Sequence, residues 1–177
     1  KQAGILTRKK FRIRIYNIDK SVIKLENKSR VGQFIHKESA TLTYDMYCSI
    51  VNGDIEFLNL SNNKLFREFY LQLKTQILKP NVIVDYIREA YIYDVSNIRI
   101  TFDKFLKTGL NRLDLFNKDL PTVDVMEEPK MILEIKYDQF LPDFIKNLLQ
   151  ISSHQRYAIS KFVVCKKFTK LNDWEDN

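Results

Sequence analysis

Charged and apolar residues alternate along five short segments of this chain, and this alternation is typical of β-strands with one polar face. The segments run over residues 10–16, 22–28, 82–88, 98–103 and 131–137. Successive side chains of a strand point to opposite faces. The residues that share a face are therefore Arg12 and Arg14, then Lys24, Glu26 and Lys28, then Arg99 and Asp103, and then Glu134 and Lys136.

Apolar residues at three- and four-residue spacings predict helices between these strands. Thr43 can cap a first helix, and Gly53 can end it. A second helix is expected over residues 63–78, before Pro80, and a short third helix begins at Pro142. Residues 117–129 are expected to form a loop. The apolar segment 160–165 is too short for periodicity to assign it to a helix or a strand.

The order of these elements predicts an α+β protein with a mainly antiparallel sheet. Charged side chains on an inner face need a closed or strongly curved sheet, such as a barrel with helices outside. A flat sheet with a solvated charged face is the alternative. Because the chain has no internal repeat and no linker rich in proline or glycine, we expect a single domain over residues 1–177.

The charged strand faces carry far more cations than carboxylates. The cations are Arg12, Arg14, Lys24, Lys28, Arg88, Arg99 and Lys136, against Glu26, Asp103 and Glu134. These cations repel one another unless a bound anion neutralises them. The formal net charge of +7 agrees with an anionic partner. The pattern predicts a polyanion site with a metal held by carboxylates, although Asp103 is expected to orient an arginine instead.

The few cysteines and histidines argue against zinc. Cys48 and Cys165 lie far apart, and so do His36 and His154, so a reduced protein with a metal bound through oxygen, Mg²⁺ or Mn²⁺, is expected. No apolar run is long enough for a membrane span, and no secretory leader is recognisable, which predicts a cytoplasmic protein. Nucleic acid is not expected as a partner, because the aromatic residues lie mostly on apolar faces.

Several of these segments, taken in order, also resemble a known family. The segments are Lys-Phe-Arg-Ile-Arg-Ile-Tyr-Asn at 10–17, Lys-Leu-Glu-Asn-Lys at 24–28, Tyr-Ile-Arg-Glu-Ala-Tyr at 86–91, Ile-Arg-Ile-Thr-Phe-Asp at 98–103, Leu-Glu-Ile-Lys-Tyr at 133–137, Leu-Pro at 141–142 and Ser-Lys at 160–161. Their order and spacing resemble the polyphosphate polymerase domain of the vacuolar transporter chaperone (VTC) family, especially its bacterial relatives.

The resemblance implies a triphosphate tunnel, an antiparallel barrel with flanking helices and a basic lumen, of the CYTH-like superfamily. It also implies transfer of the γ-phosphate of ATP to a growing inorganic polyphosphate, with Mn²⁺ or Mg²⁺. The phosphate-binding residues implied by the motifs are Arg12, Arg14, Lys28, Lys37, Arg88, Arg99 and Lys161, with Lys24, Glu26, Lys136 and Ser160 as further substrate contacts. Glu134 matches the metal ligand of the family.

One departure from the family pattern leaves the function open. The family begins with an earlier Glu-x-Lys strand and a Tyr-Phe-Asp strand, and neither motif occurs in this sequence, so the resemblance implies an N-terminally incomplete domain. A non-catalytic polyphosphate-binding module and a tunnel-type triphosphatase stay open as alternatives to the polymerase. The sequence also leaves open the product length, the oligomeric state and a membrane-protein partner.

Overall fold

The computed structural model describes residues 7–75, 78–110, 112–150 and 158–171 of the 177-residue chain. The chain is divided into two compact units. Unit 1 takes the chain as far as Pro80 together with Leu115–Lys118, and unit 2 takes Asn81–Asp114 and the remainder from Asp119.

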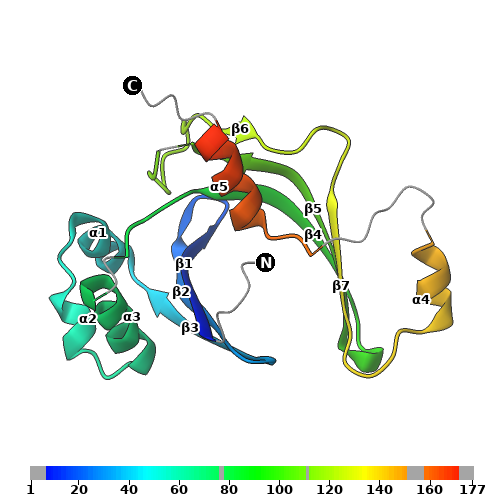
Figure 1. Cartoon of the computed structure of the whole chain (residues 1–177), viewed down its shortest axis with the longest axis horizontal. Helices are drawn as coiled ribbons and strands as arrows, with labels where there is room; N and C mark the ends of the chain where they lie inside the picture. The colour runs from blue at the N-terminus through cyan, green and yellow to red at the C-terminus, as the bar shows by residue number, and fades with distance from the viewer. Residues whose placement is uncertain (1–6, 76–77, 111, 151–157, 172–177) are drawn as a thin grey trace. The chain divides into compact units, whose positions relative to one another are not determined.

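Unit 1 consists of a three-stranded antiparallel sheet with three helices on one side of it (Figure 1). The strands are β1 (Thr7–Tyr16), β2 (Asp19–Val31) and β3 (Phe34–Leu42), paired in the order β1-β2-β3. The helices are α1 (Tyr44–Asn52), α2 (Glu56–Leu60) and α3 (Lys64–Thr75). The turn between β2 and β3 uses Gly32 with φ of 57°, a conformation that glycine adopts without strain.

The ends of α1 follow the caps that the sequence predicts. The Thr43 hydroxyl accepts a hydrogen bond from the Met46 amide at 3.1 Å, which satisfies one free donor of the first turn. Gly53 follows the helix in the left-handed region, with φ of 89°, and its amide donates to the Ile50 carbonyl at 3.2 Å. Both predicted ends of this helix are confirmed.

The apolar face of the β1–β3 sheet packs against the helices. Ile23 and Leu25 of β2 are fully buried, in one cluster with Phe66 and Phe69 of α3. Phe11 of β1 contacts Phe69, with 5.2 Å between the ring centroids. Since strand side chains alternate, Arg12, Arg14 and Glu26 of the same strands lie on the face away from this core.

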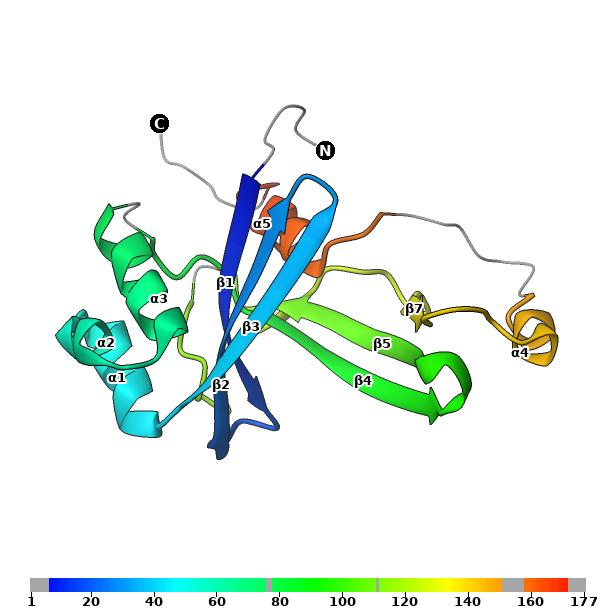
Figure 2. The ribbon, with the colours of Figure 1, turned by 90° about the horizontal axis from the view of Figure 1, so that it is seen from below.

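Unit 2 is built on a second antiparallel sheet (Figure 2). Its strands are β4 (Val84–Tyr93), β5 (Ile98–Thr108), β6 (Val123–Asp124) and β7 (Ile132–Lys136), and β5 pairs with each of the other three. A 3-10 turn, η1 (Val95–Asn97), joins β4 to β5. The helices are α4 (Asp143–Leu148) and α5 (Lys161–Leu171), and α5 contacts β4 and β5.

A bulge in β5 keeps one side of this strand buried along its length. Asp85 pairs with Lys107 and Ile87 pairs with Lys104, so two residues of β4 lie opposite three residues of β5. Phe105, within this bulge, has a φ of 51°. The extra residue leaves Asp103, Leu106 and Thr108 on the same side, and each of them is almost fully buried. Cys165 of α5 packs against Leu106, and burial raises the pKa of its thiol to about 11.

The structure confirms the five predicted strands and the three predicted helices as elements, and apart from α1 their ends are shifted. It extends the strand expected at 98–103 to Thr108 and assigns most of segment 160–165 to α5. Four elements were not predicted: β3, α2, the 3-10 turn η1 and the two-residue β6, which lies inside the expected loop 117–129. Both cysteines are free, as expected.

The fold is a mixed α and β structure with antiparallel sheets, as the sequence predicts. The closed barrel is not found. Among the strands of the described residues, pairing joins β1, β2 and β3 in one sheet and β4 to β7 in another, with no ladder between the two.

Candidate functional site

The face of the β1–β3 sheet away from the helices carries a regular array of charged side chains, here called the basic face. The register places nine residues of this face in three cross-strand rows: Lys10, Lys28 and Lys37; Arg12, Glu26 and Ser39; Arg14, Lys24 and Thr41. Six of these nine residues are cations and one is a carboxylate. The array therefore has a strong positive potential.

The single carboxylate of the basic face is held by arginines. Arg12 donates a hydrogen bond from Nε to Glu26, and Arg14 Nε lies 3.7 Å from the same carboxylate oxygen. Lys28 and Lys37 are exposed, and neither has an ion pair with any residue that the structure describes. Glu26 thus balances part of the arginine charge and leaves these two lysines unneutralised.

Directly opposed like charges recur on this face. Lys28 lies opposite both Lys10 and Lys37, and Arg14 lies opposite Lys24. The Cβ atoms of such neighbours are about 4.5–5.5 Å apart, and like charges at this spacing destabilise a sheet. A bound polyanion would remove this cost, so the array is suited to an anion with several charges.

Unit 2 contains a second charged cluster, centred on Asp103. Arg88 donates from Nε and Nη2 to the two oxygens of Asp103, at 2.6 and 2.8 Å, and Lys161 Nζ lies 2.5 Å from Oδ2. The Asp103 side chain has no exposed surface, whereas those of Arg88 and Lys161 are 25% and 20% exposed. The buried Asp103 therefore orients Arg88 and Lys161, two predicted phosphate-binding residues. The prediction that Asp103 orients an arginine is confirmed.

The ionisation of this cluster follows from its contacts. Burial opposes the charged form of Asp103, but hydrogen bonds from Arg88 and Lys161 outweigh it and hold the pKa of Asp103 below its ordinary 3.8. The hydrogen bond with Asp103 raises the pKa of Arg88, which therefore stays charged. The Tyr86 ring lies under both cations, at 5.3 Å from Arg88 Cζ and 5.0 Å from Lys161 Nζ.

Glu134 of β7 lies beside this cluster. One of its carboxylate oxygens is 3.1 Å from Lys136 Nζ, and the other is 4.0 Å from Arg88 Nη2. Burial opposes ionisation, but the hydrogen bond from Lys136 and the charges around it lower the pKa of Glu134 below 4.5. On the same sheet face Arg99 lies directly opposite Lys136, which is another pair of like charges in register.

A family model described as the VTC domain matches residues 1–170, nearly the whole chain. The chain belongs to the VTC family. Neither the curated proteins nor the solved structures gave a match to it. VTC membership associates this chain with polyphosphate and confirms the resemblance seen in the sequence.

The predicted site residues of this VTC domain fall into two groups. Unit 1 carries Arg12, Arg14, Lys24, Glu26, Lys28 and Lys37, and unit 2 carries Arg88, Arg99, Glu134, Lys136, Ser160 and Lys161. Within each unit most of them share one face of the sheet. Ser160 lies just before α5, where its carbonyl accepts a hydrogen bond from the Val164 amide at 3.0 Å.

Sequence reasoning missed two residues of these surfaces and one contact. Tyr86 lies two positions before Arg88, and Lys10 two positions before Arg12, so the period of two places each on the face of its neighbour. The third omission is the second contact of Asp103, with Lys161. Nothing in the sequence indicates this contact, because the two residues are 58 positions apart and meet only when α5 packs on β5.

The donor set for a metal is small in this VTC domain. Within the described ranges, no group of three or more His, Cys, Asp and Glu residues is arranged to hold an ion. Asp103 has no exposed surface, whereas the side chain of Glu134 is 42% exposed, so Glu134 is the carboxylate that fits the predicted role. One carboxylate suits Mg²⁺ or a similar ion only if phosphate oxygens and water supply the other ligands.

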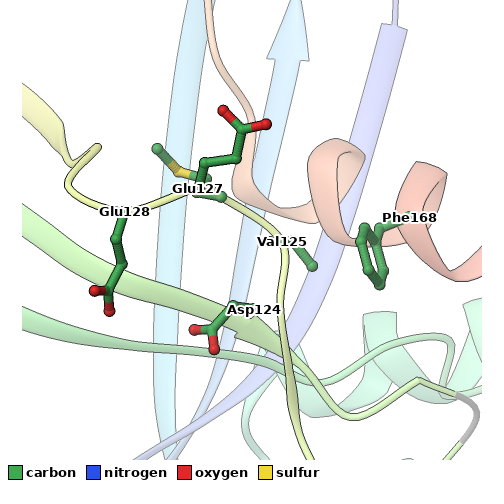
Figure 3. Close-up of a pocket in the computed structure, with 6 residues that line it drawn as sticks. Asp124, Val125, Glu127, Glu128 and Phe168 are labelled. Atoms are coloured by element: carbon green, nitrogen blue, oxygen red, sulfur yellow. The ribbon is translucent and has the colours of Figure 1, made fainter.

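A hollow beside α5 in the VTC domain has the wrong charge for phosphate (Figure 3). Its lining includes the carboxylates of Asp124, Glu127 and Glu128, together with Phe168. Lys130 Nζ lies 2.6 Å from Glu127, and Lys107 Nζ lies 3.8 Å from Asp124. This hollow is therefore not the candidate site.

No helix among the described residues combines the length and the apolar character that crossing a bilayer requires.

Acid is expected to destabilise the VTC domain partly through Asp103. Its pKa is lower in the folded state than its ordinary value, so its contribution to stability is complete above pH 3.8 and is lost as the pH falls below that value. The measurement is the free energy of unfolding in denaturant at several pH values for the wild type and Asp103→Asn. The variant should lose less stability in acid, and equal losses would contradict the role of Asp103. Exposed carboxylates contribute equally to both proteins.

Proposed function

We propose that this VTC domain is a polyphosphate polymerase that transfers the γ-phosphate of ATP to the end of an inorganic polyphosphate chain. The observation that carries the proposal is that cations lie directly opposite one another on neighbouring strands, on one sheet face of each unit. A polyphosphate has one or more negative charges on each phosphate along its length. It is therefore suited to rows of cations that repel one another when empty.

The proposed transfer needs no nucleophilic side chain. An oxygen of the terminal phosphate of the chain attacks the γ-phosphorus of ATP, the bond from that phosphorus to the bridging oxygen of ADP breaks, and the electron pair leaves with ADP. Catalysis then consists of positioning and charge stabilisation. Arg12, Arg14 and Arg88 suit both tasks, because a guanidinium stays charged and can hold two phosphate oxygens in a fork.

The proposal includes Mn²⁺ or Mg²⁺ bound by Glu134. When bound, the ion would neutralise charge on phosphate oxygens as it develops. Arg88 and Lys136 lie within 4.0 Å of the Glu134 carboxylate. Both cations would therefore compete with the metal for Glu134 in the absence of phosphate and would turn to phosphate oxygens in its presence.

The proposal also includes the triphosphate tunnel that the family resemblance implies. Variants in either unit should then weaken binding of the same triphosphate, which makes the arrangement testable without a further structure.

Product analysis tests the proposed reaction. The full-length native polypeptide is incubated with ATP and Mn²⁺, and the products are separated by chain length. ADP with a ladder of long phosphate chains supports the polymerase, whereas ADP with orthophosphate alone identifies a triphosphatase. Tight binding of polyphosphate without turnover identifies a binding module, and both of the latter results contradict the proposal.

Replacing Arg12 or Arg14 with alanine is expected to weaken triphosphate binding. Each loss should be about 1.5–3 kcal/mol, the contribution of a hydrogen bond to a charged group. Isothermal titration with tripolyphosphate measures it, and Arg67→Ala, on the exposed surface of α3, controls for the loss of one positive charge. Unchanged affinity in both variants would remove these arginines from the site.

A further inference from the structure

The end of the β2–β3 hairpin carries three large apolar residues that are mostly exposed (Figure 2). Val31 and Phe34 form the last register pair before the turn, and Ile35 follows them. These residues, called the hairpin tip below, are 59%, 74% and 54% exposed. Exposed apolar residues that gather in one place mark an interaction surface.

The core of unit 1 does not use the hairpin tip. Ile23 and Leu25 lie on the same face of β2 as Val31, and both are fully buried in the cluster with α3. Val31 lies six residues beyond Leu25, which is about 20 Å along the strand. Among the described residues, that cluster includes no residue of the tip. The apolar surface of the tip is therefore available to a partner.

The hairpin tip is apolar on both of its faces. Val31 and Phe34 lie directly opposite each other and share the helix-side face, whereas Ile35 lies on the basic face. A docked protein covers mainly one face of a hairpin. The boundary between the headgroups and the acyl chains of a bilayer instead surrounds whatever enters it. Apolar side chains on both faces therefore favour a lipid surface.

The charge next to the tip specifies the kind of lipid. Arg30 lies directly opposite Ile35, and its Nε donates to the Gly32 carbonyl at 2.6 Å. Its other guanidinium nitrogens have no partner among the residues that the structure describes. Lys28 and Lys37 are exposed about 7 Å farther along the strands, within the Debye length of about 8 Å at physiological salt. Cations beside an apolar tip complement anionic headgroups.

We propose that the hairpin tip docks this domain on the surface of an anionic bilayer. Phe34, Val31 and Ile35 enter the boundary between headgroups and acyl chains, and Arg30 binds the phosphate or carboxylate of a headgroup. The row of Arg12 lies about 14 Å from Arg30, so this docking uses a different part of the sheet and is independent of the proposed function.

Vesicle co-sedimentation of the full-length native polypeptide tests the docking. The wild type should bind vesicles of phosphatidylcholine with phosphatidylserine and should not bind vesicles of phosphatidylcholine alone. Phe34→Ser should weaken this binding about tenfold, because a buried aromatic ring is lost. Arg30→Gln should weaken it about fivefold, the effect of one cation near an anionic surface. Tripolyphosphate binding, measured by isothermal titration, should be unchanged in Phe34→Ser.

Two matched variants and one reporter complete the test. Leu60→Ser removes an 84% exposed apolar residue of α2, and Arg67→Gln removes an exposed cation of α3. Both should bind anionic vesicles like the wild type. The additional fluorescence of Phe34→Trp should be quenched by lipids with brominated acyl chains, because the ring reaches the boundary of the chains.

Three results would overturn the docking. The first is a wild type that does not bind anionic vesicles. The second is unchanged vesicle binding in Phe34→Ser, equal weakening by the matched variants, or an unquenched Phe34→Trp, because attraction would then be due to net charge. The third is a wild type that dimerises without lipid while Phe34→Ser sediments as a monomer, which would make the tip an interface between copies. Tripolyphosphate binding and turnover would be unaffected in each case, so the proposed function is tested separately.

Discussion

The variant Glu134→Gln is expected to lose polymer synthesis while it still binds polyphosphate. Glutamine keeps the size of the side chain but removes the negative charge that we propose holds Mn²⁺. Because replacement of groups that support a metal costs about 10–100-fold in affinity or activity, loss of the ligand itself should lower the turnover rate by about 100-fold or more. Polyphosphate binding should persist, since the cations of both charged faces remain.

Two measurements distinguish this role from a simple ion pair. The turnover rate is followed against Mn²⁺ concentration, and polyphosphate affinity is measured separately without ATP. Glu89→Gln is a matched control, because Glu89 belongs to the same sheet, lies on its other face and pairs with Lys104 at 2.7 Å. Lost polyphosphate binding with an unchanged rate in Glu134→Gln would show that Glu134 only orders Lys136.

The variant Asp103→Ala is expected to destabilise the protein by about 3 kcal/mol, the lower end of the range for breaking a buried ion pair. The lower end applies because Arg88 and Lys161 keep 25% and 20% of their side-chain surface exposed and gain some hydration when Asp103 is lost. The two cations would also repel each other. The expected consequence for function is a less ordered Arg88 and weaker triphosphate binding.

Denaturant unfolding of three variants isolates this effect. Asp103→Asn keeps the shape and one acceptor, so its loss of stability should be smaller than that of Asp103→Ala. Asp143→Ala removes an 89% exposed carboxylate that pairs with Lys146, and such exposed pairs contribute little. If Asp103→Ala unfolds with a free energy within about 0.5 kcal/mol of the wild type, the structural role of the cluster is wrong.

Local signals explain which elements were predicted and which were not. The alternation in β1 and β2 and the caps of α1 lie within a few residues of one another, so the sequence displays them directly. Strand β3 was missed because Phe34-Ile-His-Lys-Glu-Ser has no apolar alternation, and Phe34 and Ile35 are 74% and 54% exposed. Its identity as a strand depends on pairing with β2, which is a tertiary fact.

The sequence by itself determined the charged strand faces and the family, because these depend on residue type, period and order. Only the tertiary structure decided which cations lie opposite one another, since register is set by pairing between strands. It alone joined Lys161 to Asp103 and Arg88, because helix α5 must pack on β5 before residues so distant in sequence can meet. It also brought Lys37 of β3 directly opposite Lys28 of β2, a pair of like charges that neither segment shows by itself.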